Sequence, residues 1–250
     1  MTLTVTQIVK HFNGIKAVDG VSFEVAPGEC VALIGPNGAG KSTCFACIAG
    51  QYAAVSGQIA WQQQSLGGLT PAARLRLGLA RTFQVAQVFE ALTVLQNVQL
   101  AAQAGRGAGA ISAFKRLAAQ PLAPVQHLLD RVGLAALAGQ SASDLPYGAK
   151  KLLELAIALA AQPQLLLLDE PAAGLAQTER ADLMALVKSL AAEGLAVLYT
   201  EHNMDAVAQV ADRVLVMIEG RLAAQGSFDA ISQDPVVQQR YLGRTGAAHA

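Results

Sequence analysis

The stretch that decides the fold is Gly35-Pro-Asn-Gly-Ala-Gly-Lys-Ser-Thr43. It has the spacing Gly-x4-Gly-Lys-Ser, which is typical of a phosphate-binding loop. Its glycines carry no Cβ, so backbone N–H groups can approach a triphosphate closely and wrap it. We therefore expect the loop to bind a nucleotide through Gly35, Asn37, Gly38, Ala39, Gly40, Lys41, Ser42 and Thr43.

The residues around this loop support the same interpretation. Cys30–Ile34 is a short apolar run typical of a buried strand, so the required order of strand, loop and helix is present. Lys41 is expected to reach the outer phosphates. Ser42 begins the following helix, where its hydroxyl can ligate Mg²⁺ and the positive end of the helix dipole faces the anion. An ordinary glycine-rich turn is the alternative, and the preceding strand counts against it.

Length and charge exclude several classes of protein. The 250 residues suffice for one α/β domain, and we prefer one that carries a smaller subdomain. Eighteen basic and eighteen acidic residues leave a net charge near zero, so we expect no nucleic-acid partner. The three cysteines, Cys30, Cys44 and Cys47, cluster around the loop and are typical of buried thiols rather than of a disulfide framework.

The sequence also bears on location. Its N-terminus has neither the basic start nor the long apolar core of a secretory signal. Leu152–Leu168 is the nearest approach to a membrane span, but Glu154 and Gln162 interrupt it. We therefore expect a cytoplasmic protein that does not cross the membrane. Its high mean hydropathy indicates either subunit contacts or Ala-rich helices within an ordinary core.

The N-terminal residues Leu3–Val25 read as short strands separated by turns at Asn13-Gly14 and Asp19-Gly20. This pattern predicts an antiparallel flap ahead of the loop strand. Phe12 lies in a polar, turn-rich neighbourhood. Its ring could stack on a purine or fill a small core, and the sequence favours neither.

After the loop helix, Gly57–Trp61 reads as an edge strand and Leu79–Phe83 as a strand leading to Gln84. The pattern then becomes helical, with separators at 105–109, Pro121 and Pro124 and with expected helices at Val94–Ala102, Ile111–Leu117, Val125–Val132 and Leu152–Ala160. We expect one domain over 1–250, in which a helical subdomain, 84–160, is inserted into a core formed by 1–83 and 161–250.

Parallel-sheet patterning resumes after this insertion. The predicted elements are a strand Leu165–Leu168 that ends in Asp169-Glu170, a helix Thr178–Ala192, a strand Ala196–Thr200, a hairpin Arg213–Gln225 and a C-terminal helix near Val236–Leu242. Ligands of open α/β sheets bind outside the carboxyl ends of the strands. The fold class is therefore α/β: a P-loop NTPase parallel-sheet core with an N-terminal antiparallel β subdomain and an inserted α-helical subdomain. Gly35–Ser42, Asp169, Glu170 and His202 should meet at one site.

The chemistry of these strand ends is that of phosphate hydrolysis. Asp169 is expected to hold Mg²⁺, directly or through water. Glu170 can act as the general base that polarises the attacking water. His202 would contact the γ-phosphate or hold that water, although a lone histidine is also found on ordinary surfaces and in cores.

At this point the chain resembles the ATP-binding subunits of ABC transporters over nearly its whole length. The resemblance rests on Gly35–Thr43, Gln84, Leu145–Lys151, Asp169-Glu170-Pro171 and His202, in that order. It implies ATP and Mg²⁺ as ligands. It also implies that Gln84 contacts Mg²⁺ and senses the membrane partner, and that Phe12 stacks on adenine.

A closer resemblance is to the subunits of branched-chain amino acid importers, and it rests on the segments Ala80–Gln84, Leu92–Asn97, Glu170–Leu175, Glu201–Met204 and Tyr241–Gly243. It implies an ATPase that energises import from the cytoplasmic face of the inner membrane. The implied partners are permease subunits, a second ATP-binding subunit and, indirectly, a solute-binding protein. Urea or lipopolysaccharide transport is the alternative within this class, and a soluble regulatory ATPase is the alternative outside it.

The chain departs from the family pattern in the segment that would complete a partner's site. Pro146 stands where the family has serine, Tyr147 replaces the first glycine, and Ala149 replaces a glutamine, whereas Gly148 is kept. Proline can donate neither an O–H nor an N–H to a phosphate. This departure leads us to expect a heterodimer with unequal sites.

Overall fold

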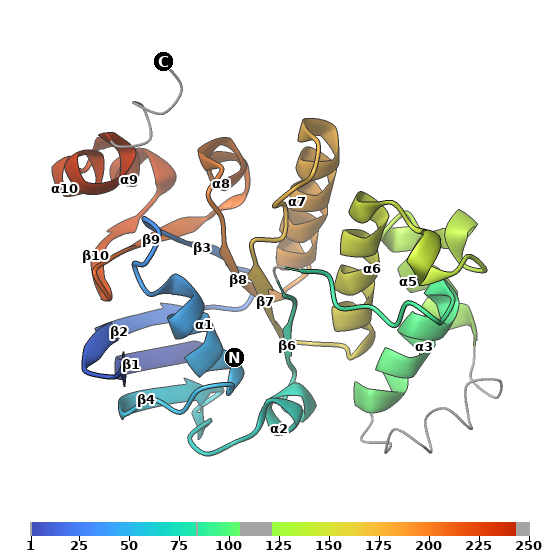
Figure 1. The fold of residues 1–250 in the computed structure, drawn as a ribbon, viewed down its shortest axis with the longest axis horizontal. Coiled ribbons are helices and arrows are strands. Elements are labelled where there is room, and N and C mark those ends of the chain that lie inside the picture. Colours follow the sequence, from blue (N-terminus) through green and yellow to red (C-terminus); the bar gives the residue numbers. More distant parts are fainter. Residues whose placement is uncertain (1, 84, 106–121, 244–250) are drawn as a thin grey trace.

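The computed structural model describes residues 2–83, 85–105 and 122–243 (Figure 1). Two sheets and a group of helices make up the described chain. The helices α3, α5 and α6 stand together at one side of the molecule, away from the small sheet of β1, β2 and β4. Among the described residues, no helix has the length and apolarity needed to span a bilayer.

The smaller sheet is antiparallel and has the order β2-β1-β4-β5. Its strands are β1 (Leu3–Phe12), β2 (Ile15–Val25), β4 (Ser56–Trp61) and β5 (Gln64–Ser65). The expected turn at Asn13-Gly14 joins β1 to β2. The expected turn at Asp19-Gly20 is wrong, because both residues lie within β2. Gly20 is instead the extra residue of a bulge: its φ is 71°, and the pairing with β1 skips it.

The larger sheet has the order β10-β9-β3-β8-β7-β6. Its strands are β3 (Cys30–Ile34), β6 (Leu79–Arg81), β7 (Leu165–Asp169), β8 (Ala196–Thr200), β9 (Arg213–Ile218) and β10 (Arg221–Gly226). The pairs are parallel except that β10 runs antiparallel to β9. Because β3 lies between β9 and β8 and is covered on both faces, every residue of this strand is buried, as its unbroken apolar pattern indicates.

Both faces of the larger sheet are covered. Val31 and Leu33 of β3 point into a core shared with α1 and the smaller sheet. Cys30, Ala32 and Ile34, which alternate with them, point into a second core shared with α7, α8 and α9. All three cysteines are free and buried, and burial raises the pKa of the Cys30 thiol to about 12.

The α-helices are α1 (Lys41–Ala49), α2 (Pro71–Arg76), α3 (Val94–Gly105), α5 (Leu122–Arg131), α6 (Tyr147–Ala160), α7 (Gln177–Ala192), α8 (Met204–Val210), α9 (Phe228–Gln233) and α10 (Pro235–Val237). Short turns of 3-10 helix at Ala135–Leu137 and Ala142–Asp144 and a π-helical turn at Gln238–Leu242 complete the described elements. Helices α3, α5 and α6 bury Val98, Leu129 and Leu153 in a core of their own.

Several helix boundaries differ from expectation. Helix α6 begins five residues before the expected Leu152, at Tyr147, since Pro146 is well placed just ahead of a first turn. Pro124 does not separate helices; it lies in the first turn of α5, where a missing N–H costs no internal bond. Helix α9 was not expected at all. The expected helix Ile111–Leu117 lies outside the described residues.

Candidate functional site

The glycine-rich loop leaves β3 and enters α1 through backbone that only glycine suits. Gly35 has φ 146° and Gly40 has φ 97°. A Cβ on Gly35 would lie 2.1 Å from the carbonyl oxygen of Met217, and one on Gly40 would lie 2.0 Å from that of Ala17. Neighbouring strands therefore press directly against the back of the loop. Helix α1 has no side-chain cap, so its first N–H groups remain available to an anion.

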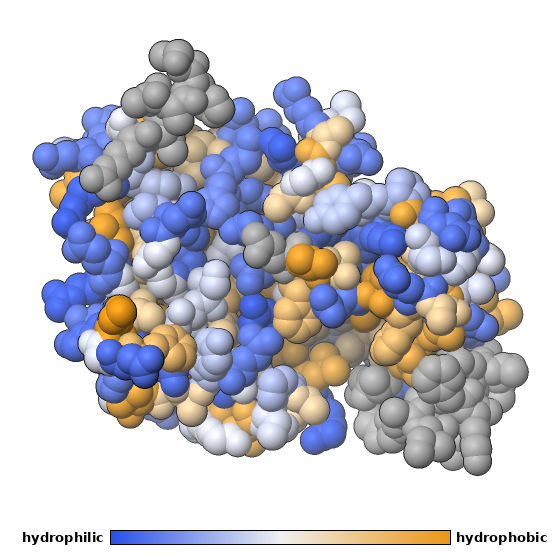
Figure 2. Space-filling view, in the orientation of Figure 1, coloured by the Kyte–Doolittle hydropathy of each residue, from blue (hydrophilic) through white to orange (hydrophobic). Residues whose placement is uncertain are grey.

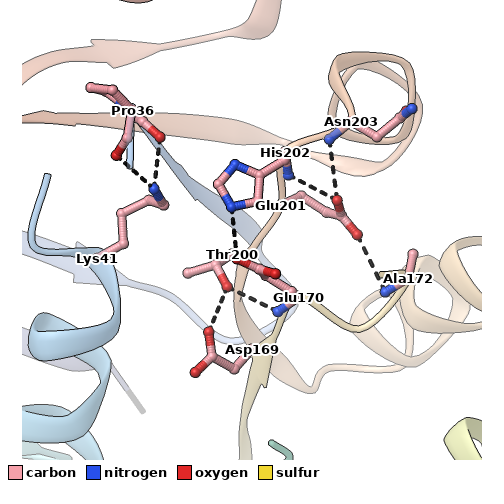
Figure 3. Close-up of polar contacts among 10 residues, drawn as sticks. Pro36, Lys41, Asp169, Glu170, Ala172, Thr200, Glu201, His202 and Asn203 are labelled. Carbon is pink, nitrogen blue, oxygen red and sulfur yellow. Dashed lines mark hydrogen bonds and ion pairs between the residues drawn. The ribbon is translucent and has the colours of Figure 1, made fainter. Parts of the chain in front are cut away.

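Lys41 lies at the start of α1 and is almost fully buried, with 6% of its surface exposed. Its Nζ donates to the carbonyl oxygens of Gly35 at 2.7 Å and Pro36 at 3.0 Å (Figure 3). Burial lowers the pKa of Lys41, while the negative charges of Glu170 and Asp169 act in the opposite direction. The ammonium is thus held within the loop by two backbone carbonyl groups. Asn37, Gly38 and Ser42 are exposed on the same loop.

Asp169 ends β7 and has both carboxylate oxygens engaged. Its Oδ1 accepts the Thr200 hydroxyl at 2.9 Å, and its Oδ2 pairs with Arg81 Nη2 at 2.9 Å. The Thr200 oxygen in turn accepts the Glu170 N–H at 2.9 Å. Arg81 and Thr200 were missed in the sequence, because Arg81 is 88 residues from Asp169 and no local pattern relates them.

Glu170 and His202 meet across the ends of the neighbouring strands β7 and β8. His202 Nε2 lies 2.7 Å from Glu170 Oε1 (Figure 3). Glu170 has φ 48°, an uncommon conformation for a residue other than glycine and one that often marks a functional position. The structure therefore brings together a carboxylate and an imidazole at the sheet edge where the glycine loop also begins.

Phe12 ends β1 and is 40% exposed, so its ring does not fill a closed core. It packs against Tyr52, with the ring centroids 5.2 Å apart in a T-shaped arrangement. Lys10 Nζ lies 5.0 Å from the Phe12 centroid and donates to the Ala53 carbonyl oxygen at 3.0 Å. The partly exposed ring remains available to a flat ligand.

The segment 145–151 lies at the start of α6, with Pro146 and Tyr147 exposed. Gly148 packs so closely that a Cβ there would lie 2.5 Å from Glu179 Oε1 on α7. The Tyr147 ring faces Gly174, in the connection between β7 and α7. Pro146 and Tyr147 are therefore exposed, while the segment packs against α7 and the connection before it.

Gln84 itself lies outside the described residues, but the chain on either side of it is anchored to α6. Glu154 Oε1 accepts the backbone N–H of Phe83 at 2.8 Å, and Lys151 Nζ donates to the Phe83 carbonyl oxygen at 3.3 Å. Burial raises the pKa of Glu154 and lowers that of Lys151. Two buried charged residues of α6 thus hold the end of the β6 segment. The Leu-rich pattern of that helix did not predict these contacts.

Comparison with known proteins assigns this geometry to a family. The family model described as ABC transporter matches residues 18–173. The chain belongs to the ABC transporter family. It is therefore an ATP-binding subunit and an ATPase of a transporter that also has membrane components. The matched range contains the glycine loop, Asp169 and Glu170.

Relatives in the ABC transporter family match almost end to end. The chain is 37% identical to the high-affinity branched-chain amino acid transport ATP-binding protein LivG of Escherichia coli K12, over 96% of this chain and 97% of the relative. It is 35% identical to the corresponding protein BraF of Pseudomonas aeruginosa, with the same coverage. These lengths leave no large segment of either relative unmatched.

Solved ABC transporter cassettes share the fold. A nucleotide-free ATP-binding cassette superposes with a TM-score of 0.86 at 31% identity, covering 96% of this chain and 99% of the other. A cassette in its ADP conformation superposes with a TM-score of 0.85 at 32% identity, covering 97% and 99%. The expected P-loop NTPase fold and the expected family are both confirmed.

Proposed function

We propose that this chain binds and hydrolyses ATP to energise an importer of branched-chain amino acids. The observation that carries the proposal is the meeting of the glycine loop, Lys41, Glu170 and His202 at the adjoining ends of β3, β7 and β8. The names of the end-to-end relatives support the choice of solute. Urea or lipopolysaccharide transport is the second candidate, because no residue of an ATP-binding subunit contacts the solute directly.

The nucleotide fits the loop as the structure presents it. Gly35 and Gly40 leave space only for backbone, and the uncapped start of α1 offers N–H groups to phosphate oxygens. Lys41 would exchange its bonds to the Gly35 and Pro36 carbonyls for bonds to the outer phosphates. Phe12 would stack its exposed face on adenine, a contact of about 1–3 kcal/mol in other base–aromatic pairs.

Mg²⁺ would be held by Ser42, Asp169 and Gln84, whose oxygens are of the type that this ion prefers. Both oxygens of Asp169 already accept bonds from the protein, and this donor set suits an ion that keeps several waters. The ion would neutralise charge on the phosphates. Glu170 would take a proton from the attacking water. His202 would hold the Glu170 carboxylate in place and would also face that water.

The permease would dock beside the helical subdomain 84–160, at the cytoplasmic face of the inner membrane. Val85 and Phe89 follow Gln84 and are 68% and 56% exposed. Figure 2 shows hydrophobic side chains gathered where the helices α3, α5 and α6 adjoin the rest of the molecule. An apolar hollow of about 240 Å³ is lined by residues of α2 and by Phe83, two positions before Val85. Such a patch suits a short apolar helix of a membrane subunit. A solute-binding protein would act from the other side of the membrane.

Reconstitution tests the proposed solute. We expect proteoliposomes that contain the transporter complex of this chain to take up leucine, isoleucine or valine only when ATP is inside and the solute-binding protein outside. Equal uptake of urea, or ATP hydrolysis unaffected by any branched-chain amino acid, would contradict the proposal. Complete absence of a membrane subunit from the purified complex would favour a soluble regulatory ATPase.

We further propose that the chain pairs with a different ATP-binding subunit and not with a second copy. In a homodimer, Pro146 would face both phosphate loops, and each site would lose a charge-assisted hydrogen bond that contributes about 1.5–3 kcal/mol. In a heterodimer, the partner's segment completes the site built on Lys41 and Glu170, and only the partner's nucleotide faces Pro146. Gly148 and the positive end of α6 would still attract that nucleotide.

Turnover rates test the asymmetry. We expect the chain alone to hydrolyse ATP slowly and the pair to be fast. Glu170→Gln in this chain should slow the pair far more than the matching substitution in the partner. The case for unequal sites fails if the two substitutions have equal effects, or if this chain alone has the activity of the pair.

A further inference from the structure

Glu201 lies between Thr200 and His202 and carries a buried carboxylate, with 4% of the residue exposed. The carboxylate accepts three backbone N–H groups (Figure 3). Its Oε1 accepts from Ala172 at 3.3 Å, and its Oε2 accepts from His202 at 2.9 Å and from Asn203 at 3.2 Å. These donors come from two different connections, one after β7 and one after β8.

The two connections are those that carry Glu170 and His202. Ala172 follows Glu170 by two residues, and the His202 N–H belongs to the residue whose ring meets the Glu170 side chain. Hydrogen bonds to an ionised group are shorter and stronger than neutral ones, and burying a carboxylate is costly unless such bonds compensate it. A third bond, to Asn203, ties the same carboxylate to the start of α8, where the Asn203 side chain is the N-cap.

We propose that Glu201 is a positioning residue that sets the Glu170–His202 contact. Its carboxylate bridges the backbone on both sides of that contact, so the distance between the two side chains depends on it. This inference rests on the proposed roles of Glu170 and His202. It adds that the geometry of the hydrolytic pair is imposed by a buried residue whose carboxylate binds backbone N–H groups.

Glu201→Gln is the direct test, because the amide keeps the size of the side chain but has only one accepting oxygen. In either orientation of the amide, its NH2 group replaces an oxygen that accepts a backbone N–H, so at least one of these hydrogen bonds is lost. In the transporter complex we expect kcat to fall about 10-fold, within the range that a misplaced catalytic group produces, while KM and the Kd for ATP change less than about 2-fold. Glu29→Gln is the matched control: Glu29 also accepts a backbone N–H, from Ala26, and it pairs with Arg213 outside the site. This control should lower Tm and leave kcat unchanged.

A double-mutant cycle separates positioning from general stability. If Glu201 acts through His202, His202→Ala and the double variant should have the same kcat, because the contact being positioned is already lost. A further 10-fold fall in the double variant would overturn the proposal, as would a lower Tm with unchanged kcat in Glu201→Gln.

Glu201→Asp is the second variant in case the glutamine variant does not fold. It keeps the charge but is one methylene shorter, so at least one of the two connections loses its bond and kcat should again fall. Wild-type kcat in a folded Asp variant would also overturn the proposal. If instead Glu170→Gln kept wild-type turnover, the proposed role of Glu170 as the general base would fail first and independently of Glu201.

Discussion

Replacing Glu170 by glutamine is expected to lower ATP turnover by about 10²-fold or more while ATP still binds, as loss of a general base does. Glutamine has nearly the same shape and can still bond His202 Nε2, which lies 2.7 Å from the carboxylate. It cannot accept a proton from water. The loss should therefore appear in kcat and not in affinity, since Lys41 and the glycine loop are unchanged.

The measurement is phosphate release by the transporter complex, together with the Kd of a fluorescent ATP analogue for the purified chain. Glu193→Gln serves as control, because Glu193 lies at the end of α7 and pairs with Arg131 outside the site. The control should retain wild-type turnover. Wild-type turnover in Glu170→Gln as well would show that another group activates the water.

Gly40→Ala is expected to cause a large loss of stability. The new Cβ would lie 2.0 Å from the Ala17 carbonyl oxygen, so either the loop or β2 must move. Overpacking of this kind costs about 1–3 kcal/mol. An unfavourable φ, here 97°, adds about 1–3 kcal/mol. ATP affinity should fall with stability, because the displaced loop is the one proposed to bind the phosphates.

Gly38→Ala is the matched control for this prediction. Gly38 has φ 79°, a similar strain, yet a Cβ there meets nothing within 4 Å. Chemical denaturation without nucleotide should therefore show a small fall in the free energy of unfolding for Gly38→Ala and a clearly larger one for Gly40→Ala. Equal losses would mean that the contact with Ala17 is easily relieved and that φ alone makes glycine necessary.

Local sequence determined the elements whose signal lies within a few consecutive residues. Cys30–Ile34 is a buried strand with the predicted bounds, and the glycine spacing predicted the turn into α1. Prolines and glycines were less reliable, as Pro124 within α5 and Gly20 within β2 show. The same residue type serves a turn, a helix start or a bulge, and the neighbouring strand or helix decides which.

The apolar runs of the sequence also predicted the parallel sheet. The carboxyl ends of adjacent parallel strands lie at one edge of such a sheet. That rule predicted that the glycine loop, Glu170 and His202 would meet. It contains no information on which side chains surround them. The partners of Asp169, the anchoring of Phe83 by α6, and the bond from Ala172 to Glu201 join residues that are 29 to 88 positions apart.

Only the tertiary structure decided these contacts, for a physical reason. A buried charge is stable only where donors or opposite charges converge on it from several elements, and that convergence depends on how the elements pack. Sequence patterning reports whether a position faces the core, whereas Lys151, Glu154 and Glu201 are charged residues at core positions. The sequence by itself therefore determined where the proposed site lies, and the packing of β7, β8 and α6 determined what holds its side chains in position.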